Sequence, residues 1–237
     1  MTISPKNACP TQGITQGMAY DATQALQNLS PQQAERSQEI FTEMVTSYAA
    51  LQDIQYGVTI YGSARVAEDA SLYAETVRLG KLLAEAGYHV ITGGGPGLMA
   101  AGNRGAHEAG KESTGLRIRL PHEQHTNPYM TKICYFNNFM TRKHMFMMHS
   151  KAYIVMSGGL GTLDELSEIF VLVQTGKLPP APIILYDTAF WQPFVNWLRH
   201  TVAAGAFIRA EDVDLLHLVD SPEQAVDIVK RYVPIAD

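Results

Sequence analysis

The chain alternates between short apolar runs and longer segments that place apolar residues three or four positions apart. The short runs predict buried strands, and the helical spacing predicts helices that pack on them. This order is typical of an α/β fold, a doubly wound, Rossmann-like parallel sheet with helices on both faces. The predicted strands are 56–61, 88–92, 114–120, 133–136, 152–156, 182–186 and 215–219. The predicted helices are 73–86, 98–109, 142–150, 163–175, 190–204 and 222–232.

The first 55 residues have a different pattern. Residues 1–29 are polar with scattered proline and glycine, so we expect a loosely ordered arm. Ser30-Pro31 then has the form of an N-cap followed by proline at the first helical position. The helix that follows is expected to pack on the main domain, with a dimer-building role as the alternative. We therefore divide the chain into an N-terminal arm and helix, 1–55, and a Rossmann-like domain, 56–237.

Composition narrows the class of protein. The 237 residues are 46% hydrophobic, which suits one α/β domain with a large core. The net charge is −5 without a long basic block, so nucleic acid is not expected as a partner. Cys9 and Cys134 lie far apart and give neither a disulfide framework nor a metal-binding spacing. We see no apolar leader and no run of about 20 apolar residues, so we expect a cytoplasmic protein that does not bind membranes.

A glycine-rich turn follows the strand 152–156 and opens the next helix. Backbone N–H groups at such a helix start point outward without partners, so an anion can bind there. Gly158, Gly159 and Gly161 remove the side chains that would keep a phosphate away, and Thr162 adds a hydroxyl donor. A structural turn is the alternative, because strand–glycine–helix turns are common in doubly wound sheets.

Two carboxylates, Asp164 and Glu165, stand at the start of the same helix. A carboxylate does not bind phosphate, so Glu165 indicates chemistry beside the phosphate. Both side chains could instead complement the helix dipole, as acids in a first turn often do.

Two further loops follow strands whose carboxyl ends share the ligand-binding edge of the sheet. Gly62-Ser63-Ala64-Arg65 offers Ser63 and Arg65 to a polar ligand, although a surface ion pair is an equal alternative for Arg65. The loop 93–97 has four glycines in five positions, so we expect it, with Gly94 and Gly95, to lie close against a ligand. Neither loop has the spacing of a dinucleotide site or of a triphosphate P-loop, which favours a nucleoside monophosphate.

Arg142 and Lys143 stand at another predicted helix start, and arginine suits phosphate or carboxylate through its two-pronged geometry. The eight histidines form no His-x-x-x-His pair. We therefore expect no metal, and we expect no cofactor.

Three motifs in order then resemble the LOG family of cytokinin riboside 5′-monophosphate phosphoribohydrolases, many of which carry the label "lysine decarboxylase". The resemblance covers about residues 56–200, and the three motifs in order make it specific. The sequence departs from the family at Ser157, where the family has proline. The motifs are Gly93-Gly94-Gly95-Pro96-Gly97-Leu98-Met99, Arg142-Lys143 and Gly158-Gly159-Leu160-Gly161-Thr162-Leu163-Asp164-Glu165.

The resemblance implies hydrolysis of the N-glycosidic bond of an adenine-type nucleoside 5′-monophosphate, with free base and ribose 5-phosphate as products. It implies Arg142 and Glu165 as the catalytic pair and a homo-oligomer, a dimer or higher. The alternatives are a non-catalytic nucleotide-binding or sensor protein and a different phosphorylated nucleoside as substrate. A lysine decarboxylase would need a Schiff-base lysine for pyridoxal phosphate, and Lys143 and Lys151 qualify only by residue type. The substrate-binding residues are then Ser63, Arg65, Gly94, Gly95, Lys143, Gly158, Gly159, Gly161 and Thr162.

Overall fold

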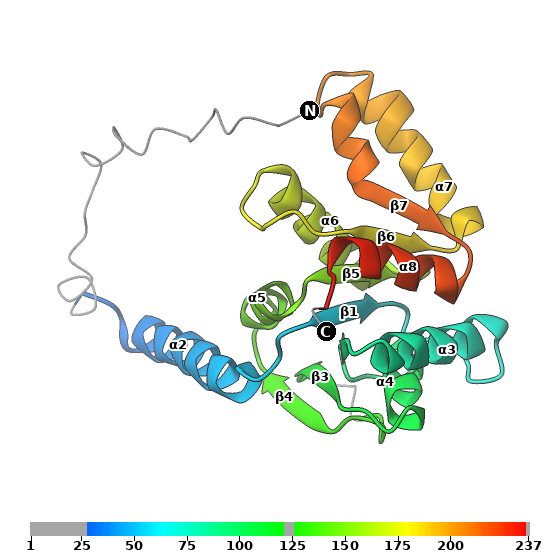
Figure 1. The fold of residues 1–237 in the computed structure, drawn as a ribbon. Coiled ribbons are helices and arrows are strands. Elements are labelled where there is room, and N and C mark those ends of the chain that lie inside the picture. The colour runs from blue at the N-terminus through cyan, green and yellow to red at the C-terminus, as the bar shows by residue number, and fades with distance from the viewer. Residues whose placement is uncertain (1–27, 121–125, 236–237) are drawn as a thin grey trace. The chain divides into compact units, whose positions relative to one another are not determined.

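The computed structural model describes residues 28–120 and 126–235, and its core is one parallel sheet of seven strands. The order β4-β3-β2-β1-β5-β6-β7 runs from the bottom to the top of Figure 1. All six neighbouring pairs are parallel, which confirms the predicted sheet. The strands are β1 (Gly57–Tyr61), β2 (His89–Thr92), β3 (Ser113–Ile118), β4 (Lys132–Phe136), β5 (Ala152–Val155), β6 (Ile183–Tyr186) and β7 (Leu216–Val219).

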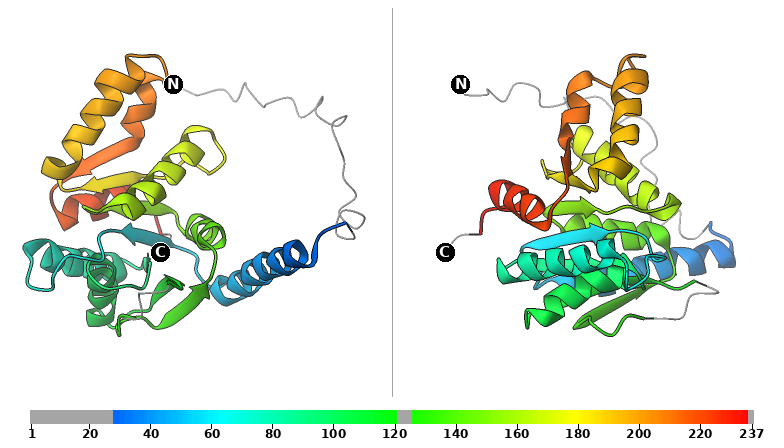
Figure 2. Two further views of the ribbon diagram at one scale, coloured as in Figure 1. Left: turned by 180° about the vertical axis from the view of Figure 1, so that it is seen from behind. Right: turned by 90° about the vertical axis from the view of Figure 1, so that its right-hand side faces the viewer.

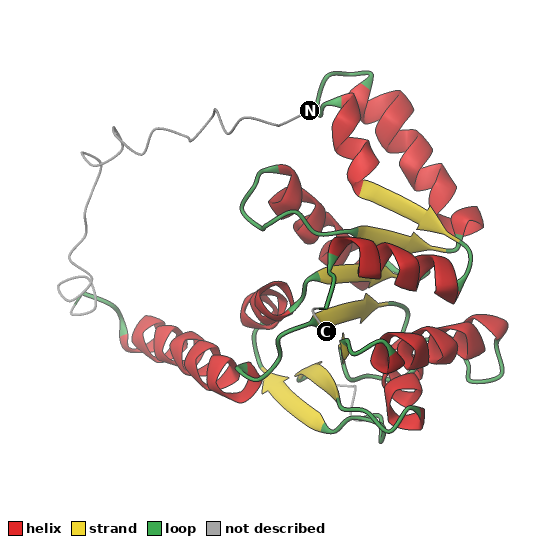
Figure 3. Cartoon of the chain, viewed as in Figure 1, coloured by secondary structure: helices red, strands yellow, loops and turns green. Residues whose placement is uncertain are grey.

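Helices cover both faces of the sheet, because successive side chains of a buried strand point to opposite faces. Val58 and Ile60 of β1 join one apolar cluster, and Tyr61 joins the other. Figure 2 shows the helices around the strands from two further directions, and Figure 3 colours helices, strands and loops separately. The first cluster packs on α3 (Ser71–Glu85), α4 (Leu98–Glu108) and α8 (Pro222–Tyr232); the second packs on α5 (Phe139–His149), α6 (Leu160–Gln174) and α7 (Thr188–Trp197).

The N-terminal helix α2 (Pro31–Leu51) starts as predicted. The Gln33 N–H donates to Ser30 Oγ at 3.3 Å, and the Ser30 N–H donates to Gln33 Oε1 at 2.9 Å. This reciprocal pair is a capping box with glutamine at the third helical position. The predicted arm 1–29 lies almost wholly outside the described residues. The chain divides into two compact units, 1–42 and 43–237, and the predicted boundary at residue 55 stays a prediction.

Several helix bounds differ from those predicted. Helices α5 and α6 begin three residues earlier, at Phe139 and Leu160. Their first residues include exposed apolar side chains, Phe139, Met140 and Leu160, which do not follow the spacing of a buried apolar face. The helix predicted over 190–204 is confirmed as helical but changes type: α7 ends at Trp197, and a π-helical segment, η1 (Leu198–Ala203), follows it directly. Over so few residues the apolar spacing of α- and π-turns is nearly the same. A 3₁₀ segment, η2 (Ala210–Leu215), was not predicted.

Candidate active site

The candidate site lies at the carboxyl edge of the sheet, beside β1 and β5. The chain runs outward from β1 to β4 and then returns to β5 on the other side of β1. This reversal of strand order is the topological switch point where ligands of open α/β sheets bind. The loops after β1, β2 and β5 therefore meet at one place, as their sequences predicted.

Backbone hydrogen bonds tie these three loops together. The Ser63 N–H donates to the Ser157 carbonyl at 3.2 Å, and the Leu98 N–H donates to the Ser63 carbonyl at 3.0 Å. A side chain at Gly97 would collide with the backbone of Ser63 and Ala64, and Gly97 has a φ of 64°, so glycine is required there. The loops form one scaffold rather than three independent segments.

The loops and the adjoining helices line a cavity of about 640 Å³. Its volume lies in the range of small-molecule and cofactor pockets. Its lining combines four charged side chains with apolar ones. The lining residues are Gly62, Ser63, Ala64, Arg65, Gly93, Met99, Arg117, Ile118, Leu120, Phe139, Arg142, Gly159, Leu160, Gly161, Thr162 and Glu165.

Two charged side chains, one from α5 and one from α6, meet in this cavity. Arg142 Nη1 lies 3.4 Å from Glu165 Oε1, and the two side chains are only 8% and 13% exposed. Arg142 Nε donates to the Leu116 carbonyl at 2.8 Å, and the guanidinium carbon lies 5.1 Å from the centre of the Phe146 ring. These contacts hold the guanidinium in place from three sides. The two residues predicted as a catalytic pair are therefore neighbours in space.

Burial changes the titration of Glu165. It raises the pKa of Glu165 to about 7, and the nearby Arg142 guanidinium offsets only part of this effect. Both protonation states are then accessible near neutral pH. A carboxyl group of this kind suits proton transfer, and strongly shifted pKa values in clefts are typical of functional sites.

The start of α6 forms another wall of the cavity. The Leu163 N–H is bonded to the Gly159 carbonyl, so the earlier N–H groups of the first turn have no partner within the helix. A side chain at Gly159 or Gly161 would meet nothing within 4 Å, and neither residue has a positive φ. The chain's own packing gives no reason for glycine at these two positions. An anion that approaches the backbone does give one.

Four predicted substrate-binding residues do not line the cavity. Lys143 lies one residue from Arg142 and points to α6, where Nζ pairs with Asp164 at 3.2 Å and Glu168 at 2.9 Å. Asp164 thus has a cation of its own, whereas Glu165 faces the cavity. Gly158 leaves room for the Thr162 side chain. The roles of these residues in binding stay predictions.

The loop 93–97 packs mainly against the protein itself. A side chain at Gly93 would meet Arg142 Nη2 at 2.5 Å and Met99 Sδ at 2.6 Å. The Gly94 N–H donates to Thr92 Oγ1 at 3.0 Å, and the Gly95 carbonyl accepts from Asn127 Nδ2 at 3.1 Å. Of this loop's glycines only Gly93 lines the cavity, so its glycine content reflects close packing on the Arg142 side chain and on neighbouring backbone more than contact with a ligand.

Several lining residues were not predicted from the sequence. Arg117 is the main one: it lies on β3, lines the cavity and is only 5% exposed. An arginine between Leu116 and Ile118 of a buried strand was a signal that could have identified it. Phe139, by contrast, is 50% exposed although it lines the cavity. Met99, Ile118 and Leu120 are apolar residues that read simply as core.

The described residues contain neither a metal-binding cluster nor a membrane-spanning helix. Within residues 28–120 and 126–235, no three His, Cys, Asp or Glu side chains are grouped so that they could hold a metal ion. None of the helices described in these ranges is long and apolar enough to cross a bilayer.

Fold and cavity together define a Rossmann-like α/β protein with a cavity at the switch point of its sheet, where ligands of such sheets bind. The family model described as "Possible lysine decarboxylase" matches residues 99–229, and this range includes α5, the start of α6 and most of the cavity. The chain belongs to this family, the LOG family.

Relatives with known names support the assignment at modest identity. The chain is 27% identical over 180 residues to cytokinin riboside 5′-monophosphate phosphoribohydrolase LOG of Oryza sativa subsp. japonica, covering 75% of this chain and 74% of that protein. It is 23% identical over 195 residues to the Arabidopsis thaliana protein of the same activity named LOG4, covering 81% of this chain and 90% of that protein.

Solved structures show the same fold. A molybdenum cofactor binding protein from Rippkaea orientalis gives a TM-score of 0.54 at 21% identity, covering 74% of this chain and 94% of that one. The molybdenum cofactor carrier protein from Chlamydomonas reinhardtii gives a TM-score of 0.53 at 21% identity, covering 76% of this chain and 99% of that one. At this identity the likeness concerns the fold alone.

Proposed function

We propose that the protein hydrolyses the N-glycosidic bond of an adenine-type nucleoside 5′-monophosphate, AMP or a cytokinin riboside 5′-monophosphate. The products are the free base and ribose 5-phosphate. The observation that carries the proposal is the buried Arg142–Glu165 pair, which shares one cavity with the open helix start at Gly159 and Gly161. The names of the rice and Arabidopsis relatives support the reaction class.

The reaction breaks the bond between C1′ of the ribose and a nitrogen of the base. Its electron pair leaves with the base, so positive charge develops on the sugar, as in glycoside hydrolysis. Glu165 as a carboxylate stabilises that charge and accepts a proton from the water that adds to C1′. The departing base takes up one proton, so that the free base and a ribose hydroxyl are formed.

Arg142 acts beside Glu165 as a holding group. Its Nε is engaged with the Leu116 carbonyl, which leaves the two terminal nitrogens for the carboxylate and the substrate. A guanidinium cannot give up a proton near neutral pH, so it orients the substrate or polarises the departing base and does not act as the acid.

The N–H groups at the start of α6 bind the 5′-phosphate, and the Thr162 hydroxyl adds a donor. Glu165 lies on the same helix about one turn further on, so an anchored phosphate sets the position of the ribose relative to the carboxylate. Binding energy from the phosphate, which does not react, is thereby used to orient the bond that breaks.

The test is to incubate the protein with AMP and to measure free adenine by chromatography. The proposal expects adenine and ribose 5-phosphate in equal amounts, and little release from adenosine, which lacks the phosphate. A parallel panel of other nucleoside 5′-monophosphates tests the choice of base. Tight AMP binding with no base released from any nucleotide would instead identify a non-catalytic nucleotide-binding protein.

A further inference from the structure

The first turn of α5 contributes two side chains to the cavity, Phe139 and Arg142. The residue that precedes this helix, Asn138, is extended and its side chain does not cap the helix. The first helical hydrogen bond, from the Arg142 N–H to the Asn138 carbonyl, is 3.2 Å long. The donors that come before it must find partners outside the helix.

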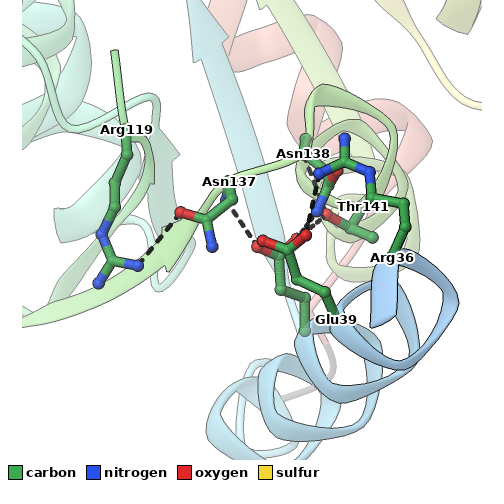
Figure 4. A network of polar contacts seen from close by, with 7 residues as sticks. Arg36, Glu39, Arg119, Asn137, Asn138 and Thr141 are labelled. Carbon is green, nitrogen blue, oxygen red and sulfur yellow. Dashed lines mark hydrogen bonds and ion pairs between the residues drawn. The ribbon is translucent and has the colours of Figure 1, made fainter. Parts of the chain in front are cut away.

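Glu43 of α2, distant in sequence, holds the start of this helix through other groups. Its Oε1 accepts from the Asn137 N–H at 2.6 Å, and its Oε2 accepts from Asn138 Nδ2 at 3.0 Å and from Thr141 Oγ1 at 2.6 Å. Figure 4 shows Asn137, Asn138 and Thr141 within the network of polar contacts at this helix start, with hydrogen bonds and ion pairs as dashed lines. In this sense the carboxylate caps the start of α5 from another helix: it holds the two residues that lead into the helix and the Thr141 hydroxyl, at the helix end where negative charge is favoured.

The titration of Glu43 agrees with this role. Burial works to raise the pKa of Glu43, but the hydrogen bonds from Thr141, Asn137 and Asn138 outweigh burial and hold the pKa below its usual value. The group is thus ionised throughout the neutral range. It can accept hydrogen bonds from all of these donors at once, which a neutral side chain cannot do.

We propose that Glu43 is a positioning residue that fixes the first turn of α5 and, through it, the Arg142 guanidinium beside Glu165. Only the expected effect of Glu43 on kinetics rests on the proposed function; its effect on the position of Arg142 does not. If Glu43 is removed, the first turn loses its cap, and Arg142 loses the backbone position from which it reaches both the Leu116 carbonyl and Glu165.

The charge around Glu165 gives a direct measurement that needs no substrate. Apart from Arg142, the charged groups near Glu165 are Lys143 on α5 and Asp164 and Glu168 on α6, and Tyr61 of β1 also lies close. Only Arg142 belongs to the capped first turn and faces the carboxylate at 3.4 Å. When the guanidinium moves away, the pKa of Glu165 must therefore rise further.

The experiment compares Glu43→Ala and Glu43→Gln with Tyr48→Phe as the matched control. Tyr48 also lies on α2 and joins α5, through its hydroxyl and His144 Nε2 at 2.6 Å, but His144 lies in the middle of the helix and not in the first turn. ¹³C NMR of the glutamate carboxyl groups, with Glu165 assigned through Glu165→Gln, follows the pKa of Glu165 in each protein.

We expect the pKa of Glu165 to rise by roughly one pH unit in Glu43→Ala and to be unchanged in Tyr48→Phe. Glu43→Gln keeps the size of the side chain and one acceptor, so it should lie between the two. The inference is overturned if Glu43→Gln folds with an unchanged Glu165 pKa and lowers the melting temperature only as much as Tyr48→Phe does. Glu43 would then be a structural contact and not a positioning residue.

Kinetics provide the second measurement. With AMP, kcat/KM of Glu43→Ala should fall roughly 10- to 100-fold, because small displacements of a catalytic group have effects of this size, and Tyr48→Phe should stay within about twofold of the wild type. If the wild type releases no base from any nucleotide, the proposed function fails, while the pKa measurement still decides the role of Glu43.

Discussion

Ser157 Oγ donates a hydrogen bond to Asp187 Oδ2 at 2.9 Å and so ties the loop after β5 to the turn after β6. Asp187 has a φ of 83°, rare for a residue other than glycine, and its other oxygen accepts from the Phe190 N–H at the start of α7. Serine stands here in place of the family's proline. The hydrogen bond restrains the loop that proline would stiffen through its ring.

Ser157→Ala tests this restraint. Loss of the hydrogen bond should lower the free energy of unfolding by about 0.5–1.5 kcal/mol. Because the loop after β5 would then be less restrained, KM for AMP should rise more than kcat falls. Urea denaturation and steady-state kinetics measure the two effects. A variant with wild-type stability and wild-type KM would show that the bond does not hold the loop.

Gly161→Ala should separate ligand binding from folding. A methyl group at this position meets no protein atom within 4 Å, and alanine favours a helix by roughly 0.5–1 kcal/mol over glycine. The melting temperature should stay the same or rise. The methyl group would nevertheless stand where the phosphate approaches, and loss of one hydrogen bond to a charged group, about 1.5–3 kcal/mol, corresponds to about 10- to 100-fold in KM for AMP.

Inhibition by adenosine is the internal control for Gly161→Ala, because adenosine has no phosphate to displace. Equal losses for AMP and adenosine would place the phosphate elsewhere.

Gly93→Ala should cause part of the loss of kcat/KM that a substitution of Arg142 causes, although Arg142 itself is unchanged. The added methyl group would meet Arg142 Nη2 and Met99 Sδ, and the guanidinium is already fixed by its bond to the Leu116 carbonyl. We expect kcat/KM to fall about 10- to 100-fold. In a double-mutant cycle with Arg142→Ala the two effects should not add, since they act on one side chain. Additive losses would mean that Gly93 acts independently of Arg142.

The pKa of Glu165 makes activity and stability depend on pH in opposite directions. If the carboxylate is the reactive form, kcat/KM should rise as the pH increases through about 7. Stability should change the other way. Because the folded state holds the Glu165 proton more tightly than the unfolded chain does, this group's contribution to stability falls as the pH rises from about 4.5 to about 7.

Glu165→Gln removes that titration. The free energy of unfolding of Glu165→Gln, measured relative to the wild type by urea denaturation, should therefore be higher at pH 8 than at pH 5. The expected increase is on the order of 1–3 kcal/mol. The variant's release of adenine should be lost while AMP still binds. A difference from the wild type that is the same at both pH values would mean that Glu165 titrates normally.

The sequence predicted the sheet and the meeting of three loops for physical reasons that are local. Buried parallel strands are nearly continuous apolar runs, and the carboxyl ends of parallel strands share one edge. Gly62–Arg65 and Ser157–Thr162 could therefore be placed together before any contact was known. Helix α8 was predicted with its observed bounds because Ser221-Pro222 marks its start in the chain itself.

What could not be predicted depends on contacts between distant segments. Arg142 and Lys143 are adjacent in the sequence, but neighbours on a helix point about 100° apart, so only one of them could face the cavity. Which one does so is set by the position of α6 against α5. The cap that Glu43 provides joins residues nearly 100 positions apart, and no local pattern marks it.

The cavity is lined by groups of unlike character. Arg142 and Glu165 are charged and the start of α6 presents backbone N–H groups, while Ile118, Leu120 and the half-exposed Phe139 are apolar. Under the proposed function, substitutions of Ile118 or Leu120 change which base fits while the Arg142–Glu165 pair itself is unaltered. In a family built on this scaffold, selectivity and reactivity can therefore diverge separately during evolution.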